Sequence, residues 1–94
     1  MAAFTVRVEL HKASSGDYDE LHKKMEADGF SRTIVGRSGT EYHLPTAEYD
    51  YEHKTMTASE VVDKACAVAS GVKGKPAVFV TQAETRSWKG LDEV

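Results

Sequence analysis

The chain has 94 residues, which is enough for one hydrophobic core and too few for two. Its apolar fraction of 40% and charged fraction of 29% are typical of globular proteins and argue against a disordered or fibrous chain. The net charge of −3 excludes a strongly basic nucleic-acid-binding domain, so any nucleic-acid site has to be a local patch.

The sequence also bears on location. No apolar run approaches the roughly 20 residues that a membrane-spanning helix needs, and the first residues lack the basic and apolar segments of a signal peptide. The single cysteine, Cys66, has no partner for an internal disulfide, which suits a reducing compartment. We therefore expect a cytoplasmic protein that makes no membrane contact.

Residues 3–11 alternate between apolar and polar side chains, which predicts a strand with one buried face. The outward face is polar and presents Arg7, Glu9 and His11. A helix is predicted next, because residues 14–17 supply capping side chains and apolar residues then recur at helical spacing. Asp17 and Glu20 are the expected capping pair, and Gly29 is expected to close the helix.

Residues 30–35 combine β-branched and aromatic side chains, and the glycine-containing segment 36–39 separates them from a second extended run over 40–51. This pattern predicts a hairpin. Within the second run the apolar parity changes on either side of Pro45. Because proline cannot donate to a strand ladder and one extra residue reverses the faces, we expect a bulge at or near Pro45.

The second helix has the strongest local signal. Thr57 and Glu60 form a capping box, an apolar stripe follows, and Gly71 lies where the helix would stop, so we predict a helix over 58–70. A last strand is predicted over 77–82, after Pro76. The expected core contains Val6, Val8, Leu21, Met25, Val61, Ala65, Val78 and Val80.

The element order is β-α-β-β-α-β, which predicts an α+β fold. We expect a ferredoxin-like two-layer sandwich, with a four-stranded antiparallel sheet of order 4-1-3-2 and two helices on one face. The whole of 1–94 would be a single domain with its core over about 3–84. The remaining residues, 85–94, would form a short tail, and Trp88 and Leu91 suggest that part of this tail packs back.

The densest polar cluster lies in and around the hairpin and consists of Arg32, Arg37, Tyr42, His43, Tyr49 and Tyr51. Arginines can hold phosphates and tyrosines can stack on bases, so the cluster is a candidate RNA-binding surface, with Arg7 and His11 on the open sheet face. The alternative is structural, with the tyrosines packing on strand neighbours and the arginines in solvent.

Histidine is the side chain whose ordinary pKa suits acid–base catalysis at neutral pH, so His43 and His11 are candidates for a metal-free RNA cleavage. The four histidines show no metal-ligand spacing, and we expect neither a metal nor a cofactor. No glycine-rich phosphate loop or GxSxG motif is present, so the common enzyme classes are unsupported.

Two short motifs carry a resemblance. Gly29-Phe30-Ser31-Arg32-Thr33-Ile34 precedes a glycine turn, and Thr57-Ala58-Ser59-Glu60-Val61 begins the second helix. With these motifs the chain resembles the GhoS antitoxin endoribonuclease family over roughly residues 4–82. The resemblance implies a ferredoxin-like fold similar to that of the small CRISPR-associated nucleases, and cleavage of a toxin messenger RNA.

The resemblance also implies site residues. An arginine on the first helix is implicated in cleavage in that family, and His22 occupies the aligned position here, which adds His22 to His43 as a catalytic candidate. The CRISPR-associated nucleases carry a metal-binding aspartate near the end of the first strand, where this chain has Glu9 and His11. This departure argues against metal-dependent cleavage.

Three classes of function follow from the sequence. The first is an antitoxin-like protein that binds or cleaves single-stranded RNA, and it needs a local basic patch. The second is a non-enzymatic module that pairs with itself or with another protein through its sheet, and it needs an unpaired edge or an exposed apolar patch. The third is a small-ligand domain, which needs a closed pocket.

Overall fold

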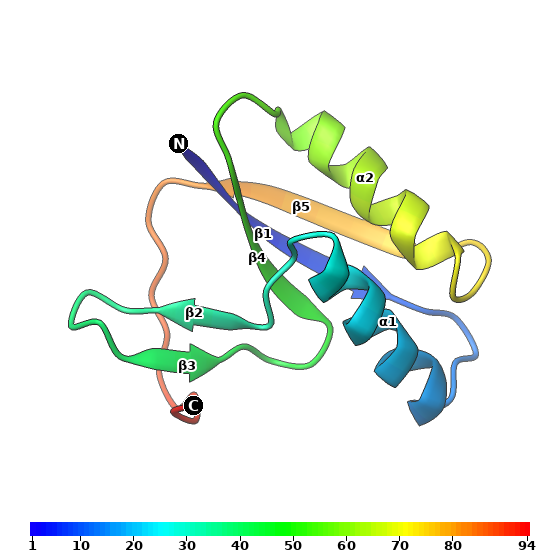
Figure 1. Ribbon diagram of the computed structural model, residues 1–94, viewed down its shortest axis with the longest axis horizontal. Helices are drawn as coiled ribbons and strands as arrows, with labels where there is room; N and C mark the ends of the chain where they lie inside the picture. The colour runs from blue at the N-terminus through cyan, green and yellow to red at the C-terminus, as the bar shows by residue number, and fades with distance from the viewer.

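The computed structural model describes all of residues 1–94. The chain folds into two helices and five strands (Figure 1). In order they are β1 (Ala2–Glu9), α1 (Ser15–Ala27), β2 (Thr33–Val35), β3 (Glu41–His43), β4 (Glu48–His53), α2 (Ala58–Ser70) and β5 (Ala77–Ala83). The predicted α+β class is confirmed.

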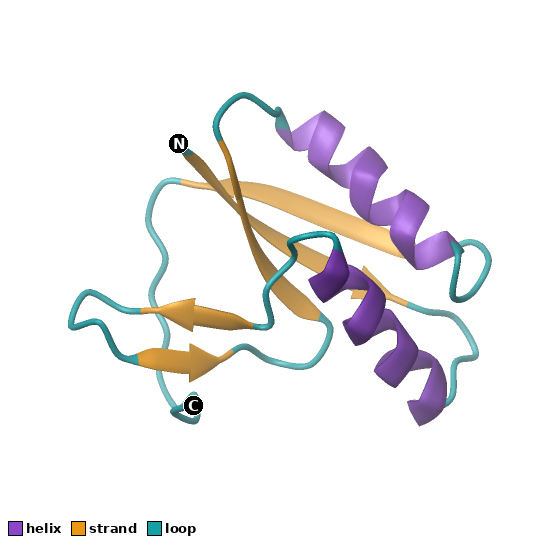
Figure 2. Cartoon of the chain, in the orientation of Figure 1, coloured by secondary structure: helices purple, strands orange, loops and turns teal.

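The strands form two antiparallel sheets. The larger sheet has the order β4-β1-β5, with β1 antiparallel to both neighbours. The smaller sheet is the hairpin of β2 and β3, which extends beside the larger sheet (Figure 2). Both helices contribute buried side chains to one core against β1, so the opposite face of the larger sheet is free of helices.

The expected four-stranded sheet of order 4-1-3-2 is not confirmed. The predicted third strand is divided into β3 and β4 by residues 44–47, where Pro45 cannot donate to a ladder and Ala47 has a φ of 66°. The predicted bulge is therefore a complete interruption. As a result, the segment before β2 pairs with β4 at one antiparallel bridge, between Ser31 and Asp50.

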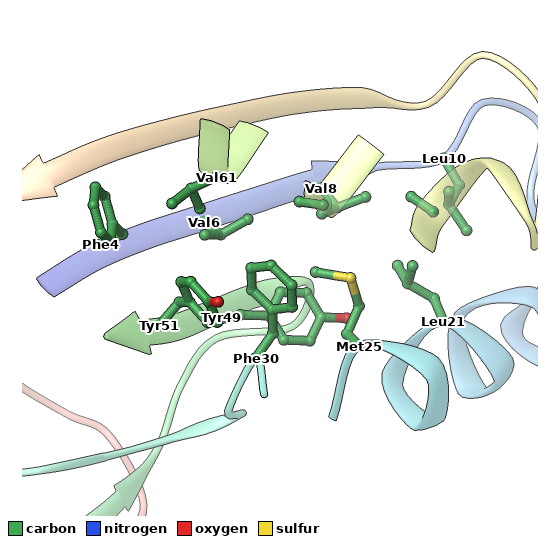
Figure 3. Close-up of a cluster of buried hydrophobic side chains, with 12 residues drawn as sticks. Phe4, Val6, Val8, Leu10, Leu21, Met25, Phe30, Tyr49, Tyr51 and Val61 are labelled. Carbon is green, nitrogen blue, oxygen red and sulfur yellow. The ribbon is translucent and has the colours of Figure 1, made fainter. Parts of the chain in front are cut away.

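The core lies between the two helices and β1. Its buried members are Phe4, Val6, Val8, Leu10, Leu21, Met25, Phe30, Tyr49, Tyr51, Val61, Ala65 and Ala69 (Figure 3). The four apolar residues at alternate positions of the first strand are all inside, as predicted. Val78 and Val80 were expected in the core but are only partly buried, because β5 is an edge strand.

Capping boxes begin both helices. The Thr57 hydroxyl accepts from the Glu60 N–H at 3.2 Å and the Glu60 carboxylate accepts from the Thr57 N–H at 2.9 Å, so α2 has its predicted bounds. In α1 the cap is Ser14 with Asp17, which corrects the expected pair of Asp17 and Glu20. The backbone hydrogen bond from Ser14 lowers the pKa of the Asp17 carboxyl.

Candidate functional site

The tail beyond β5 turns back onto the hairpin. The His43 N–H donates to the Asp92 carbonyl at 2.8 Å, and the Val94 N–H donates to the Glu41 carbonyl at 3.0 Å. An antiparallel bridge joins Tyr42 to Glu93 between these two bonds. Figure 1 shows the tail running from the end of β5 across the hairpin to the C-terminus beside β3. The tail therefore extends the smaller sheet.

Arg86 attaches the start of the tail to the larger sheet. Its Nη1 donates to Asp50 Oδ1 at 2.8 Å and also lies 3.4 Å from Thr5 Oγ1 and 3.5 Å from the Phe4 carbonyl oxygen. The Arg86 and Asp50 side chains are only 25% and 16% exposed. Because this ion pair is partly shielded from water, it is stronger than an ordinary surface pair.

A cleft of about 510 Å³ lies between the larger sheet, the hairpin and the tail. The residues that line it include Thr5, Ile34, Leu44, Glu48, Arg86 and Trp88. Two neighbouring hollows, of about 240 and 380 Å³, are also lined by Arg86 and Trp88, together with Gly36 and Arg37 of the hairpin turn. Trp88 is thus the point at which three hollows meet.

The Trp88 ring is held in place by the hairpin and remains half-buried. It packs edge-on against Tyr42, with the ring centroids 5.8 Å apart and an interplanar angle of 63°. A Cβ atom at Gly36 would lie 3.3 Å from Cζ2 of Trp88, so the indole passes close to the backbone of the turn. This packing fixes an aromatic surface at the mouth of the cleft.

The charges around Trp88 are mixed. None of the four ion pairs of the molecule includes Arg37 or Lys89, so these two exposed cations are free to bind an anion. Arg86, the third cation near Trp88, forms an ion pair with Asp50. Glu48 also lines the cleft and limits its net positive charge.

His22, the catalytic candidate taken from the resemblance, lies inside the molecule. Its side chain is 7% exposed and its Nδ1 is 2.7 Å from the hydroxyl of Tyr49. Desolvation lowers the pKa of His22, with a further contribution from Arg32, and burial raises the pKa of Tyr49 to about 12. Both groups are therefore uncharged at neutral pH and lie where RNA does not reach.

Tyr51 also belongs to the core. Its ring stacks on Phe30 at 4.4 Å between centroids, and its hydroxyl accepts a hydrogen bond from Lys64 Nζ at 3.0 Å. Tyr49 is 0% exposed and Tyr51 is 6% exposed, so neither ring can stack on a base. Both tyrosines of β4 therefore have the structural role that was the alternative to RNA binding, in which they pack against their neighbours.

Other predicted residues lie at the surface or close to it. Tyr42 packs against Trp88, and Arg37 lines a hollow beside the same ring. Arg32 is half-buried near His22. His43 is exposed, and its backbone N–H binds the tail.

Arg7 and His11 are both exposed as expected, but neither lines the cleft. His11 Nδ1 lies 3.9 Å from Glu9 Oε1. The structure therefore brings together only part of the predicted cluster.

The sequence contained a signal for the remaining residues of this site. The single tryptophan of the chain stands between cations in Arg86-Ser87-Trp88-Lys89. Such a segment in a polar tail indicates a functional aromatic as well as a packing residue. We expected Trp88 to pack back on the domain, but no residue pattern in the tail indicated that the hairpin would be its neighbour.

No cluster of three or more histidine, cysteine, aspartate or glutamate side chains is arranged to hold a metal ion. None of the helices has the length and apolar character needed to cross a membrane. Comparison of the chain with known protein families, curated proteins and solved structures gives no match. The geometry of the Trp88 cleft is accordingly the basis for a functional proposal.

Proposed function

We propose that the protein binds single-stranded RNA in the cleft around Trp88. The observation that carries this proposal is the meeting of three hollows at a fixed, half-buried indole, with the unpaired cations Arg37 and Lys89 beside it. Aromatic rings bind single strands by stacking on bases, and cations hold the phosphates between those bases.

The form of the site favours a single strand over a duplex. Indole stacking needs an unpaired base, and the bases of an A-form duplex are already stacked on one another. The cleft has a volume within the range of small-ligand pockets, which suits an inserted base rather than a long duplex groove. Because only two cations are free and the chain is net acidic, we expect weak and salt-sensitive binding.

The proposal is for binding, with no assigned cleavage step. None of the residues that line the three hollows is a histidine, and His22 is paired with Tyr49 in the interior. An acid–base pair for metal-free cleavage is therefore not part of the cleft. Incubating the wild-type protein with the same RNA tests for cleavage separately from binding.

We also propose that the architecture is a ferredoxin-like sandwich with a reduced second strand, in a cytoplasmic protein related to the GhoS antitoxins. The order β5-β1-β4 corresponds to strands 4-1-3 of that fold, and Ser31 occupies the outer edge of β4, where strand 2 would pair. The resemblance of the sequence motifs to an RNA-directed family agrees with the RNA proposal.

The experiment is fluorescence anisotropy of a labelled, mixed-sequence single-stranded RNA. Two phosphate contacts predict that the logarithm of affinity falls with the logarithm of salt concentration with a slope of roughly −1.4. Arg37→Glu and Lys89→Glu should each weaken binding and flatten this slope. Lys23→Glu makes the same charge change on an exposed position of α1 and serves as the control. An equal loss in all three variants would contradict a site at the cleft.

A further inference from the structure

The larger sheet has one free edge. In the order β4-β1-β5, β5 pairs with β1 on one side and with no strand on the other. The opposite edge is partly covered, because the Ser31 N–H donates to the Asp50 carbonyl and the Asp50 N–H donates to the Ser31 carbonyl, both at 2.8 Å. Figure 2 shows β5 running along the full length of the sheet. The unpaired backbone groups are therefore concentrated on β5.

The β5 edge lacks the features that normally protect an exposed strand. Its seven residues, Ala-Val-Phe-Val-Thr-Gln-Ala, include no charge and no proline. Natural edges are usually shortened, charged, bulged or covered, because an open edge is a template for another strand. Phe79 also projects from β5 with 70% of its surface exposed. These features indicate a surface that another strand covers.

We propose that two copies of this chain pair through β5 in an antiparallel, two-fold symmetric arrangement centred on Val80. The two larger sheets would then become one continuous sheet. In this register Ala77 of each copy lies opposite Ala83 of the other, so all seven residues of the strand are paired. Pro76 falls outside the pairing, where its missing N–H costs no ladder hydrogen bond. This dimer is independent of the RNA proposal.

The exposed aromatic supports this register. When Val80 lies on the axis, Phe79 is opposite Thr81 of the second copy and diagonal to Phe79 of the second copy. Diagonal neighbours in an antiparallel pair have Cα atoms roughly 7–8 Å apart, within reach of aromatic side chains. The two exposed rings therefore cover each other, as a self-complementary interface requires.

The charges that flank β5 support a second copy as the partner. Lys75 precedes the strand and Glu84 follows it. In the pairing centred on Val80, Glu84 of one copy lies opposite Pro76 of the other, one position along the chain from Lys75. Opposite charges therefore lie at the same end of the strand pair, and the two-fold axis repeats this arrangement at the other end. In this pairing no charged residue lies opposite a residue of like charge. Because the β4 edge is partly covered, we expect assembly to stop at the dimer.

Sedimentation velocity of the full chain over a range of concentrations is the first test, with a reversible monomer–dimer equilibrium expected. Phe79→Glu and Phe79→Lys should each be monomeric, because two like charges would meet across the axis. An equimolar mixture of these two variants should form a heterodimer. Phe79 is largely exposed, so both variants should keep the wild-type circular dichroism spectrum. A wild type that stays monomeric throughout, or that grows beyond a dimer, would overturn the proposal.

A charge exchange tests the antiparallel direction of the pairing. Lys75→Glu and Glu84→Lys should each weaken the dimer, and the double variant should restore it, because the opposite charges then meet again with reversed polarity. Failure of the double variant to recover dimerisation would contradict antiparallel pairing through β5. Trp88→Phe should dimerise like the wild type, since the cleft takes no part in this contact.

Discussion

The imidazole Nδ1 of His22 lies 2.7 Å from the hydroxyl oxygen of Tyr49 and joins α1 to β4 inside the core. The raised pKa of Tyr49, about 12, keeps its hydroxyl protonated, and the lowered pKa of His22 keeps the ring neutral. The hydroxyl can therefore donate to an unprotonated Nδ1. This relationship makes His22 a core residue whose charge state is coupled to folding.

Stability should therefore fall in mild acid. The folded-state pKa of His22 lies below its unfolded value of about 6.5, so the unfolded chain binds more protons once the pH drops below that value. The contribution of the neutral His22 is complete above about pH 6.5 and is lost as the pH falls through the folded pKa. Asp19 and Glu26 oppose the shift, while Arg32 adds to it. Urea midpoints of the wild type and of His22→Gln at about pH 7.5 and 5.5 measure the effect. If acid lowered the urea midpoints of both proteins equally, the loss of stability would not come from His22, because the other three histidines are the same in both proteins.

Val8→Asp should unfold the domain. Val8 is 2% exposed on the helix side of β1, and an unpaired buried carboxylate costs several kcal/mol against a total stability of about 5–15 kcal/mol. Arg7→Asp places the same carboxylate on the exposed face of the same strand and should cost under about 1 kcal/mol. Thermal melts followed by circular dichroism compare the two. Similar melting temperatures would contradict the face assignment of β1.

Thr57→Ala should destabilise the protein by roughly 1 kcal/mol, because the first turn of α2 loses the side-chain acceptor for the Glu60 N–H. Ser59→Ala, an exposed change in the same turn, is the control and should have little effect. Denaturant midpoints give the comparison. If the Thr57 and Ser59 variants were equally stable, the capping box would contribute nothing measurable.

Arg86→Ala should release the tail from the sheet. Loss of the bond to Asp50 removes the anchor at the start of the tail, so the amide of His43, which donates to Asp92, should exchange faster with solvent. Hydrogen exchange measured by NMR reports this directly, and Lys89→Ala serves as the unpaired control. Unchanged protection of the His43 amide would show that the tail is held without Arg86.

Local sequence signals were sufficient for β1 and α2. Alternation identifies the buried face of β1, and the capping box of Thr57 together with Gly71 fixes the bounds of α2. These features depend on residues a few positions apart, which is why the sequence alone could predict them.

The site depended on contacts between distant residues. The buried faces of Tyr49 and Tyr51 follow from the interruption at residues 44–47, and a change of one residue in its length would reverse them. The cleft depends on the bond between Arg86 and Asp50, which are 36 positions apart. No local pattern records such a pairing. Of the candidate RNA-binding residues, Arg37 and Tyr42 of the hairpin lie beside Trp88, whereas the sequence did not indicate that the hairpin would be the neighbour of the tail.

The most direct test of RNA binding at the cleft is the emission of Trp88, the single tryptophan of the chain. Titration with mixed-sequence single-stranded RNA at low salt should quench this emission in a saturable way, because a stacked base lies against the indole. Added salt should reverse the quenching, and duplex RNA of the same sequence should not cause it. Trp88 emission that stays constant while anisotropy shows the RNA to be bound would contradict a site in this cleft.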